Sequence, residues 1–108
     1  MKIASSRVTA VECSDQGLAR TLLERMFRVA NLDRVGMVGF GLNLGLSAPV
    51  GDVFTDQKLP GVHLSLGETF PEKTGASWTS KSWLALTTVD VDVDIDRLPI
   101  VRRGRYMI

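Results

Sequence analysis

The sequence predicts an α+β fold in a single domain over residues 1–108: a twisted, mixed and mostly antiparallel sheet with one main amphipathic helix packed on it. Apolar residues recur at helical spacing from Asp15 to Ala30, and they alternate strictly with aspartates from Val89 to Asp96. Shorter apolar runs elsewhere are bounded by Gly, Pro and Asp, which is typical of strands and turns. A chain of 108 residues suffices for one modest core.

The composition is that of an ordinary soluble protein, with 44% hydrophobic and 23% charged residues. The net charge of +1 gives no general attraction to nucleic acid or anionic membranes, so neither partner is expected. The lone Cys13 excludes an intramolecular disulfide and cannot build a zinc site by itself. With no signal peptide and no long apolar run, these features favour a cytoplasmic protein, and no cofactor is indicated.

The helix at 15–30 is the clearest element. Ser14 and Asp15 can cap its first turn, and Asn31 is a plausible cap at its other end. We expect its apolar face, which carries Leu22, Leu23 and Phe27, to pack on the sheet.

The remaining elements are short. Strands are expected within residues 3–13, 35–43, 62–66, 82–96 and 100–108. The stretch 35–43, VGMVGFGLN, is punctuated by glycines but lacks the spacing of a nucleotide-binding loop. A polar loop at 67–81 separates two apolar runs, and a loop of this length in a small domain is usually functional or mobile.

The DVDVDID row at 90–96 invites a calcium interpretation, but neither possible register has the glycine and glutamate of an EF-hand loop. On a strand, alternate side chains point to opposite faces. We therefore expect the aspartates to face solvent, paired with Arg102, Arg103 and Arg105 of the closing strand.

The residues by themselves make a poor case for catalysis. His63 is the only histidine, and no cluster of histidines and cysteines accompanies it. Ser80 and Ser82 have no candidate general base other than His63 and no nucleophile-elbow motif. We expect that the protein is not an enzyme.

Three stretches, VGMVGFGLN, GDVFTDQK and PGVHLSLGETFPEKTGASWTSKSWLA, occur in an order that resembles the C-terminal part of the aminopeptidase T family of metallopeptidases. Members of that family show a Glu-x-Gly-x-Gly-x-Asn strand and an Asp-Glu-Lys turn. A His-(Ile/Leu)-(Ala/Ser)-x-Gly strand ending near a tyrosine and a Ser-x-x-His-x-Asp strand then follow. Each motif is weakly specific, and their common order and spacing over most of the chain carry the resemblance.

The resemblance implies a two-metal site that this chain has largely lost. The five ligand positions of the family fall on Met37, His63, Phe70, Trp83 and Ala85. Only His63 keeps a metal-binding side chain, and the larger N-terminal part of the family is missing. The chain therefore resembles a truncated pseudo-peptidase with no metal site of its own.

The leading hypothesis is a non-catalytic peptide-binding protein, because apolar and aromatic groups at former ligand positions would line a pocket suited to peptide side chains. The expected peptide-binding residues are His63, Phe70 and Trp83, with Asn43, Lys58 and Thr74 as polar contacts. Its ligand could be a precursor peptide handed to modifying enzymes in peptide natural-product biosynthesis. For Phe70 and Trp83 the alternative is that they are ordinary core aromatics.

Two other functions stay open. A truncated domain leaves apolar surface to be covered, which favours a dimerising structural or regulatory protein. Members of the resembled family are dimers, so a homodimer is expected. The chain could also be a subunit of an active metallopeptidase in which a partner chain supplies the missing ligands.

Overall fold

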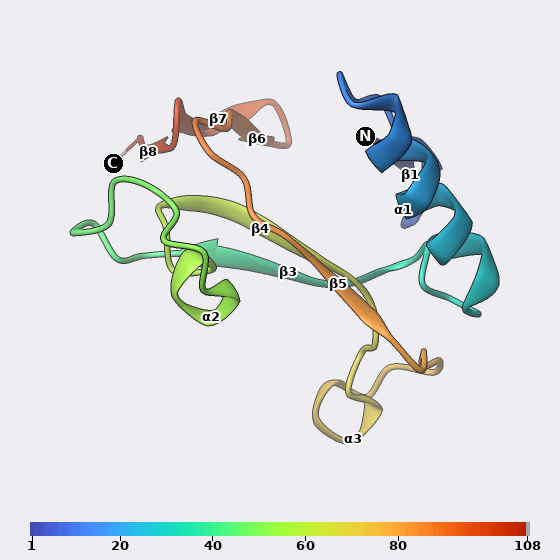
Figure 1. Ribbon diagram of the computed structural model, residues 1–108. Helices are drawn as coiled ribbons and strands as arrows, with labels where there is room; N and C mark the ends of the chain where they lie inside the picture. Colours follow the sequence, from blue (N-terminus) through green and yellow to red (C-terminus); the bar gives the residue numbers. More distant parts are fainter. Residues whose placement is uncertain (108) are drawn as a thin grey trace. The chain divides into compact units, whose positions relative to one another are not determined.

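The computed structural model describes residues 1–107, which form two compact units (Figure 1). Unit 1 consists of Met1–Met37 and Ser65–Leu84. Unit 2 consists of Val38–Leu64 and the chain from Ala85 onward. Each unit therefore combines two separate stretches of sequence.

The strands form three short antiparallel sheets, so the expectation of one continuous mixed sheet is wrong. The first is a hairpin of β1 (Lys2–Ala4) and β2 (Arg7–Ala10). The second has the order β3-β4-β5 and contains β3 (Val35–Gly41), β4 (Gly61–Gly67) and β5 (Trp83–Leu86). The third has the order β6-β7-β8 and contains β6 (Val93–Ile95), β7 (Leu98–Arg102) and β8 (Arg105–Tyr106). The α+β class is confirmed, with one main helix.

The helix of unit 1, α1 (Gln16–Arg28), begins as the sequence predicts. The Asp15 carboxylate accepts a hydrogen bond of 3.0 Å from the Leu18 N–H, so Asp15 is the N-cap. The side chain that this helix buries is Met26, and Phe27 is 79% exposed. The expectation that Phe27 packs on the sheet is therefore wrong, and part of the apolar face of α1 stays uncovered.

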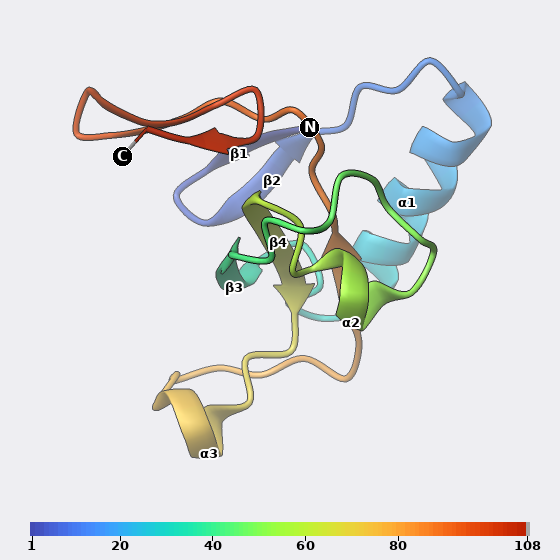
Figure 2. The same ribbon diagram turned by 90° about the vertical axis from the view of Figure 1, so that its left-hand side faces the viewer.

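The core of unit 1 contains Met26, Leu32 and Leu66. The loop after β4 is not structureless, because it contains the short helix α3 (Pro71–Thr74), as both ribbon views show (Figures 1 and 2). Gly67, at the end of β4, has a positive φ of 93°. A Cβ atom there would lie 2.3 Å from the Ser82 carbonyl oxygen, so only glycine fits this crossing.

Unit 2 contains the short helix α2 (Val53–Asp56) and the sheet of β6, β7 and β8. The strand expected at 82–96 is interrupted: β5 ends at Leu86, and β6 spans only Val93–Ile95. Asp90 and Asp96 have positive φ values of 54° and 51°. Aspartate tolerates this left-handed conformation, which is common in turns.

The aspartates of this row are used in different ways. Asp94 pairs with Arg102 at 2.5 Å, as the sequence predicts. Asp92 accepts a hydrogen bond of 2.7 Å from the backbone N–H of Arg103. At the centre of the sheet, Val101 is fully buried and pairs with Val93 and Tyr106.

Within residues 1–107, no helix is long and apolar enough to cross a membrane.

Candidate functional site

The six predicted binding residues are divided between the two units. Asn43, Lys58 and His63 belong to unit 2. Phe70, Thr74 and Trp83 belong to unit 1. No single unit contains the whole predicted set, so each group is considered within its own unit.

His63 lies in β4, is 3% exposed and has both ring nitrogens engaged. Its Nδ1 accepts a hydrogen bond of 3.1 Å from the Thr88 N–H. The ring must then carry its proton on Nε2, which donates to the Leu59 carbonyl at 2.8 Å. A metal ion or a peptide donor could reach an imidazole lone pair only by displacing one of these partners. The side chain therefore holds Thr88 against β4, where the Thr88 hydroxyl also donates to the Val62 carbonyl.

Asn43 shapes the chain that follows β3. Its N–H donates to the Lys58 carbonyl at 2.9 Å, and its side-chain oxygen accepts a hydrogen bond of 3.0 Å from the Gly45 N–H. The second bond is the local turn that asparagine commonly forms. Both Asn43 and Lys58 are exposed.

Phe70 and Trp83 are 55% and 41% exposed, so their interpretation as ordinary core aromatics is wrong. Phe70 stands just before α3 with a φ of 50°, a conformation that costs a residue with a side chain about 1 kcal/mol or more. The Thr74 hydroxyl donates to the Thr69 carbonyl at 2.8 Å and so belongs to the turn itself.

The Glu68 carboxylate stabilises this turn through hydrogen bonds. Its carboxylate accepts hydrogen bonds from the Thr79 hydroxyl at 2.8 Å and from the N–H groups of Thr69 and Phe70 at 2.7 and 2.9 Å. The bonds from Thr79, Phe70 and Thr69 favour the charged form and hold the pKa of Glu68 below its ordinary value, although partial desolvation opposes them.

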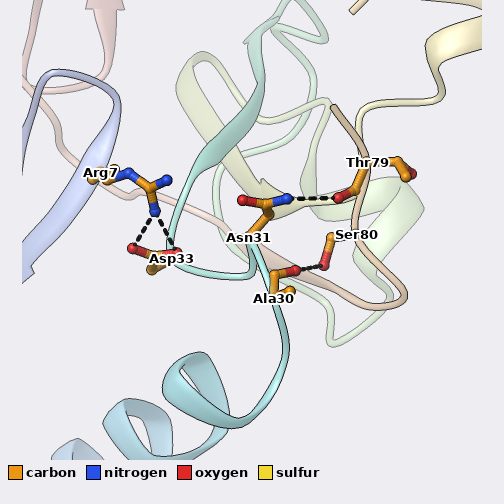
Figure 3. A network of polar contacts seen from close by, with 6 residues as sticks. All are labelled: Arg7, Ala30, Asn31, Asp33, Thr79 and Ser80. Atoms are coloured by element: carbon orange, nitrogen blue, oxygen red, sulfur yellow. Dashed lines mark hydrogen bonds and ion pairs between the residues drawn. The ribbon is translucent and has the colours of Figure 1, made fainter. Parts of the chain in front are cut away.

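A set of polar contacts fixes the segment before β5 to the end of α1 (Figure 3). The Asn31 amide donates to the Thr79 carbonyl at 3.0 Å, and the buried Ser80 hydroxyl donates to the Ala30 carbonyl at 2.8 Å. Beside them, one guanidinium nitrogen of Arg7 donates to both carboxylate oxygens of Asp33, at 3.0 and 2.8 Å. We call the contacts of Asn31 and Ser80 the polar clamp. Each of these two side chains donates a hydrogen bond within the fold.

Unit 2 presents apolar side chains at four alternating positions along the end of β3 and the residues after it. Val38, Phe40, Leu42 and Leu44 are 45–79% exposed, and we call them the apolar stripe. The glycine between two of them, Gly41, packs closely: a Cβ there would lie 1.7 Å from the Leu59 carbonyl oxygen. β3 is an edge strand of its sheet.

The last residue of the apolar stripe also lines a pocket of about 500 Å³ within unit 2. Its apolar lining includes Leu44, Leu46 and Val89, and its charged lining residues are Asp90, Arg103 and Arg105. Thr88, which His63 holds in place, is part of the lining. Tyr106 also lines the pocket, and its hydroxyl donates to the Gly41 carbonyl at 2.7 Å. This volume lies within the range of small-ligand pockets.

The apolar stripe and the pocket were not predicted from the sequence. The only available signal was that the alternation of β3 continues past its glycines to Leu42 and Leu44. Val89, Arg103 and Tyr106 are far from Leu44 in the sequence, so only the fold brings them together. Among residues 1–107, no three His, Cys, Asp or Glu side chains are grouped as metal ligands.

No protein-family model matches the chain, and no curated protein or solved structure matches it either. The resemblance to aminopeptidase T therefore stays a prediction from the motifs.

Proposed function

We propose that the protein is a non-catalytic peptide-binding module, and that unit 2 binds an extended peptide segment along the apolar stripe. The observation that carries this proposal is the spacing of Val38, Phe40, Leu42 and Leu44, which are exposed at every second position. Val38 and Phe40 lie in β3, where alternate residues repeat at about 6.6–6.8 Å, so a bound strand can match the spacing of these two side chains. Leu42 and Leu44 follow the strand and extend the apolar surface beyond its end.

The position of β3 supports the same ligand. An edge strand has no neighbour on one side within its sheet, and extended peptides commonly bind by adding a strand there. Apolar side chains on an exposed edge are otherwise a liability, because they promote aggregation. A bound peptide would cover them.

The pocket at the end of the apolar stripe supplies an anchor. Leu44, Leu46 and Val89 can receive one apolar side chain of the peptide. The lining also carries two arginines and one aspartate, and this excess of positive charge favours a carboxylate near the anchoring residue. The preferred ligand is thus an extended segment with alternating apolar residues and an acidic end.

The test is fluorescence anisotropy with a labelled nine-residue peptide that alternates leucine and threonine and ends in a free carboxylate. We expect saturable binding, and a loss of about tenfold or more with Phe40→Ser, because a buried aromatic contact is among the stronger ones in an interface. Phe54→Ser is the matched control, since Phe54 is equally an exposed phenylalanine of unit 2 but lies on α2 outside the apolar stripe.

Two results would contradict the proposal. One is the absence of saturable binding by the wild-type protein. The other is an equal loss with both variants, which would mean that exposed phenylalanines act only through general stickiness. A second peptide with proline at its central position should bind weakly, because proline cannot donate the backbone hydrogen bond of an added strand.

The finer parts of the hypothesis remain proposals. They are the precursor peptide of a natural-product pathway as ligand, a cytoplasmic location, and the rival role as a metallopeptidase subunit. For that rival, His63 would have to release the Thr88 N–H or the Leu59 carbonyl before it could bind a metal ion.

A further inference from the structure

A second uncovered apolar surface lies in unit 1, apart from the proposed peptide site. It is a broad groove of about 760 Å³ between α1 and the segment that precedes it. Val11, Glu12 and Cys13 form one side, and α1 contributes Gln16, Ala19, Arg20, Leu23, Glu24, Phe27 and Arg28. Phe27 is the most exposed apolar side chain of this helix, at 79%. We call the groove and its exposed phenylalanine the α1 face.

The charged side chains beside the α1 face indicate which kind of partner surface can bind there. Arg20, Glu24 and Arg28 follow one another at intervals of four residues, so they form a row of alternating sign along one side of the helix. A partner must present opposite charges at the same spacing. The same helix in reverse direction does so for Arg20 and Glu24, because Glu24 of one copy then meets Arg20 of the other, and Arg28 falls at the level of the uncharged Gln16.

The register of such a pair follows from helix geometry. If a two-fold axis passes at the level of Leu22, Arg20 and Glu24 lie about 3 Å to either side of it, and each therefore faces the other residue type in the second copy. At this register the two Leu23 side chains lie side by side, about 1.5 Å from the axis level. Phe27 falls between the levels of Gln16 and Ala19 of the other copy, both of which line the groove.

We propose that this face binds a second copy of the chain, with the two α1 helices antiparallel. The contact is isologous, so every favourable pair occurs twice. Leu23 and Phe27 supply the apolar centre, and the two pairs of Arg20 with Glu24 set the direction and register. This contact uses none of the residues of the apolar stripe, so the failure of one proposal leaves the other standing.

The test uses the full chain, a reducing agent because Cys13 is exposed, and two charge reversals, Arg20→Glu and Glu24→Arg. The wild-type protein should dimerise with concentration in sedimentation equilibrium. Each single reversal should weaken the homodimer about tenfold, because two attractive pairs become repulsive.

Mixing the two single variants separates the contact between copies from effects within one helix. Each variant keeps its own like-charge pair at i and i+4, yet in a mixed dimer every Glu faces an Arg. Native mass spectrometry of an equimolar mixture should therefore show the heterodimer in excess of both homodimers. The double variant Arg20→Glu/Glu24→Arg should dimerise like the wild type.

Circular dichroism establishes that each variant keeps its helix. A wild-type protein that stays monomeric up to about 1 mM (a dissociation constant corresponding to only about 4 kcal/mol) would overturn the proposal. So would a mixture without preferred heterodimer, or single variants that dimerise as well as the wild type.

Discussion

The polar clamp of unit 1 and the apolar stripe of unit 2 differ in how their side chains are used. In the polar clamp, Asn31 and Ser80 each donate to a backbone carbonyl, and Ser80 is buried. In the apolar stripe, Phe40 and Leu44 are 45% and 79% exposed. Asn31 and Ser80 are thus occupied within the fold, whereas the proposed binding surface consists of apolar side chains that the fold leaves uncovered.

The same contrast explains the role of the only histidine. A buried imidazole without partners would destabilise the fold, so its bonds to Thr88 and Leu59 offset the cost of its burial. Uncovered apolar side chains carry no such requirement, because exposure costs them nothing beyond what the unfolded chain already bears. Such side chains can stay exposed in the free protein and become buried when a partner binds.

The largest expected effect concerns the backbone beneath the apolar stripe. Gly41→Ala places a methyl group against the Leu59 carbonyl oxygen, and the strand must move to make room. We expect a destabilisation on the order of 3 kcal/mol, measured by urea unfolding. Gly39→Ala is the control, since a Cβ at Gly39 meets nothing within 4 Å. Equal stability of the two variants would mean that β3 does not approach Leu59 so closely.

A smaller effect is expected in the polar clamp. Ser80→Ala removes the donor to the Ala30 carbonyl and leaves that oxygen without its partner, which should cost about 1–3 kcal/mol in thermal or urea unfolding. Ser77→Ala serves as the control, because Ser77 is exposed. Peptide binding by Ser80→Ala should be unchanged under conditions where it is folded. A change in affinity without a change in stability would show that the polar clamp is part of a binding site.

The smallest effect depends on pH. The pKa of Glu68 is lowered in the folded protein from an ordinary value of 4.5, chiefly by the Thr79 hydroxyl, and then by the Phe70 and Thr69 N–H groups. A lowered pKa means that the carboxylate contributes stability above about pH 4.5, and that this contribution is lost as the pH falls through the folded pKa. The melting temperature of the wild type should therefore approach that of Glu68→Gln on acidification. A constant difference down to about pH 3 would contradict the role of the charged form.

The local elements were largely predictable, because they depend on neighbours in the sequence. The N-cap at Asp15 follows from the position of a short acidic side chain before a helical pattern. The alternation from Val89 to Asp96 was misleading, since a period of two shows only that a strand is possible. Asp90 and Asp96 adopt left-handed conformations that a regular strand does not contain. The strand in this stretch, β6, therefore spans only Val93–Ile95.

For the candidate site, residues close together in the sequence are enough to predict the helix and the apolar alternation of β3, and the spacing of Arg20, Glu24 and Arg28 gives the row of alternating charge on α1. Which of these features are accessible depends on the tertiary fold. It gave His63 two backbone partners, placed Arg103 and Tyr106 beside Leu44, and left Phe27 and Phe40 uncovered. The physical reason is that burial and hydrogen-bond satisfaction depend on residues distant in the chain, whereas capping and periodicity depend on residues a few positions away.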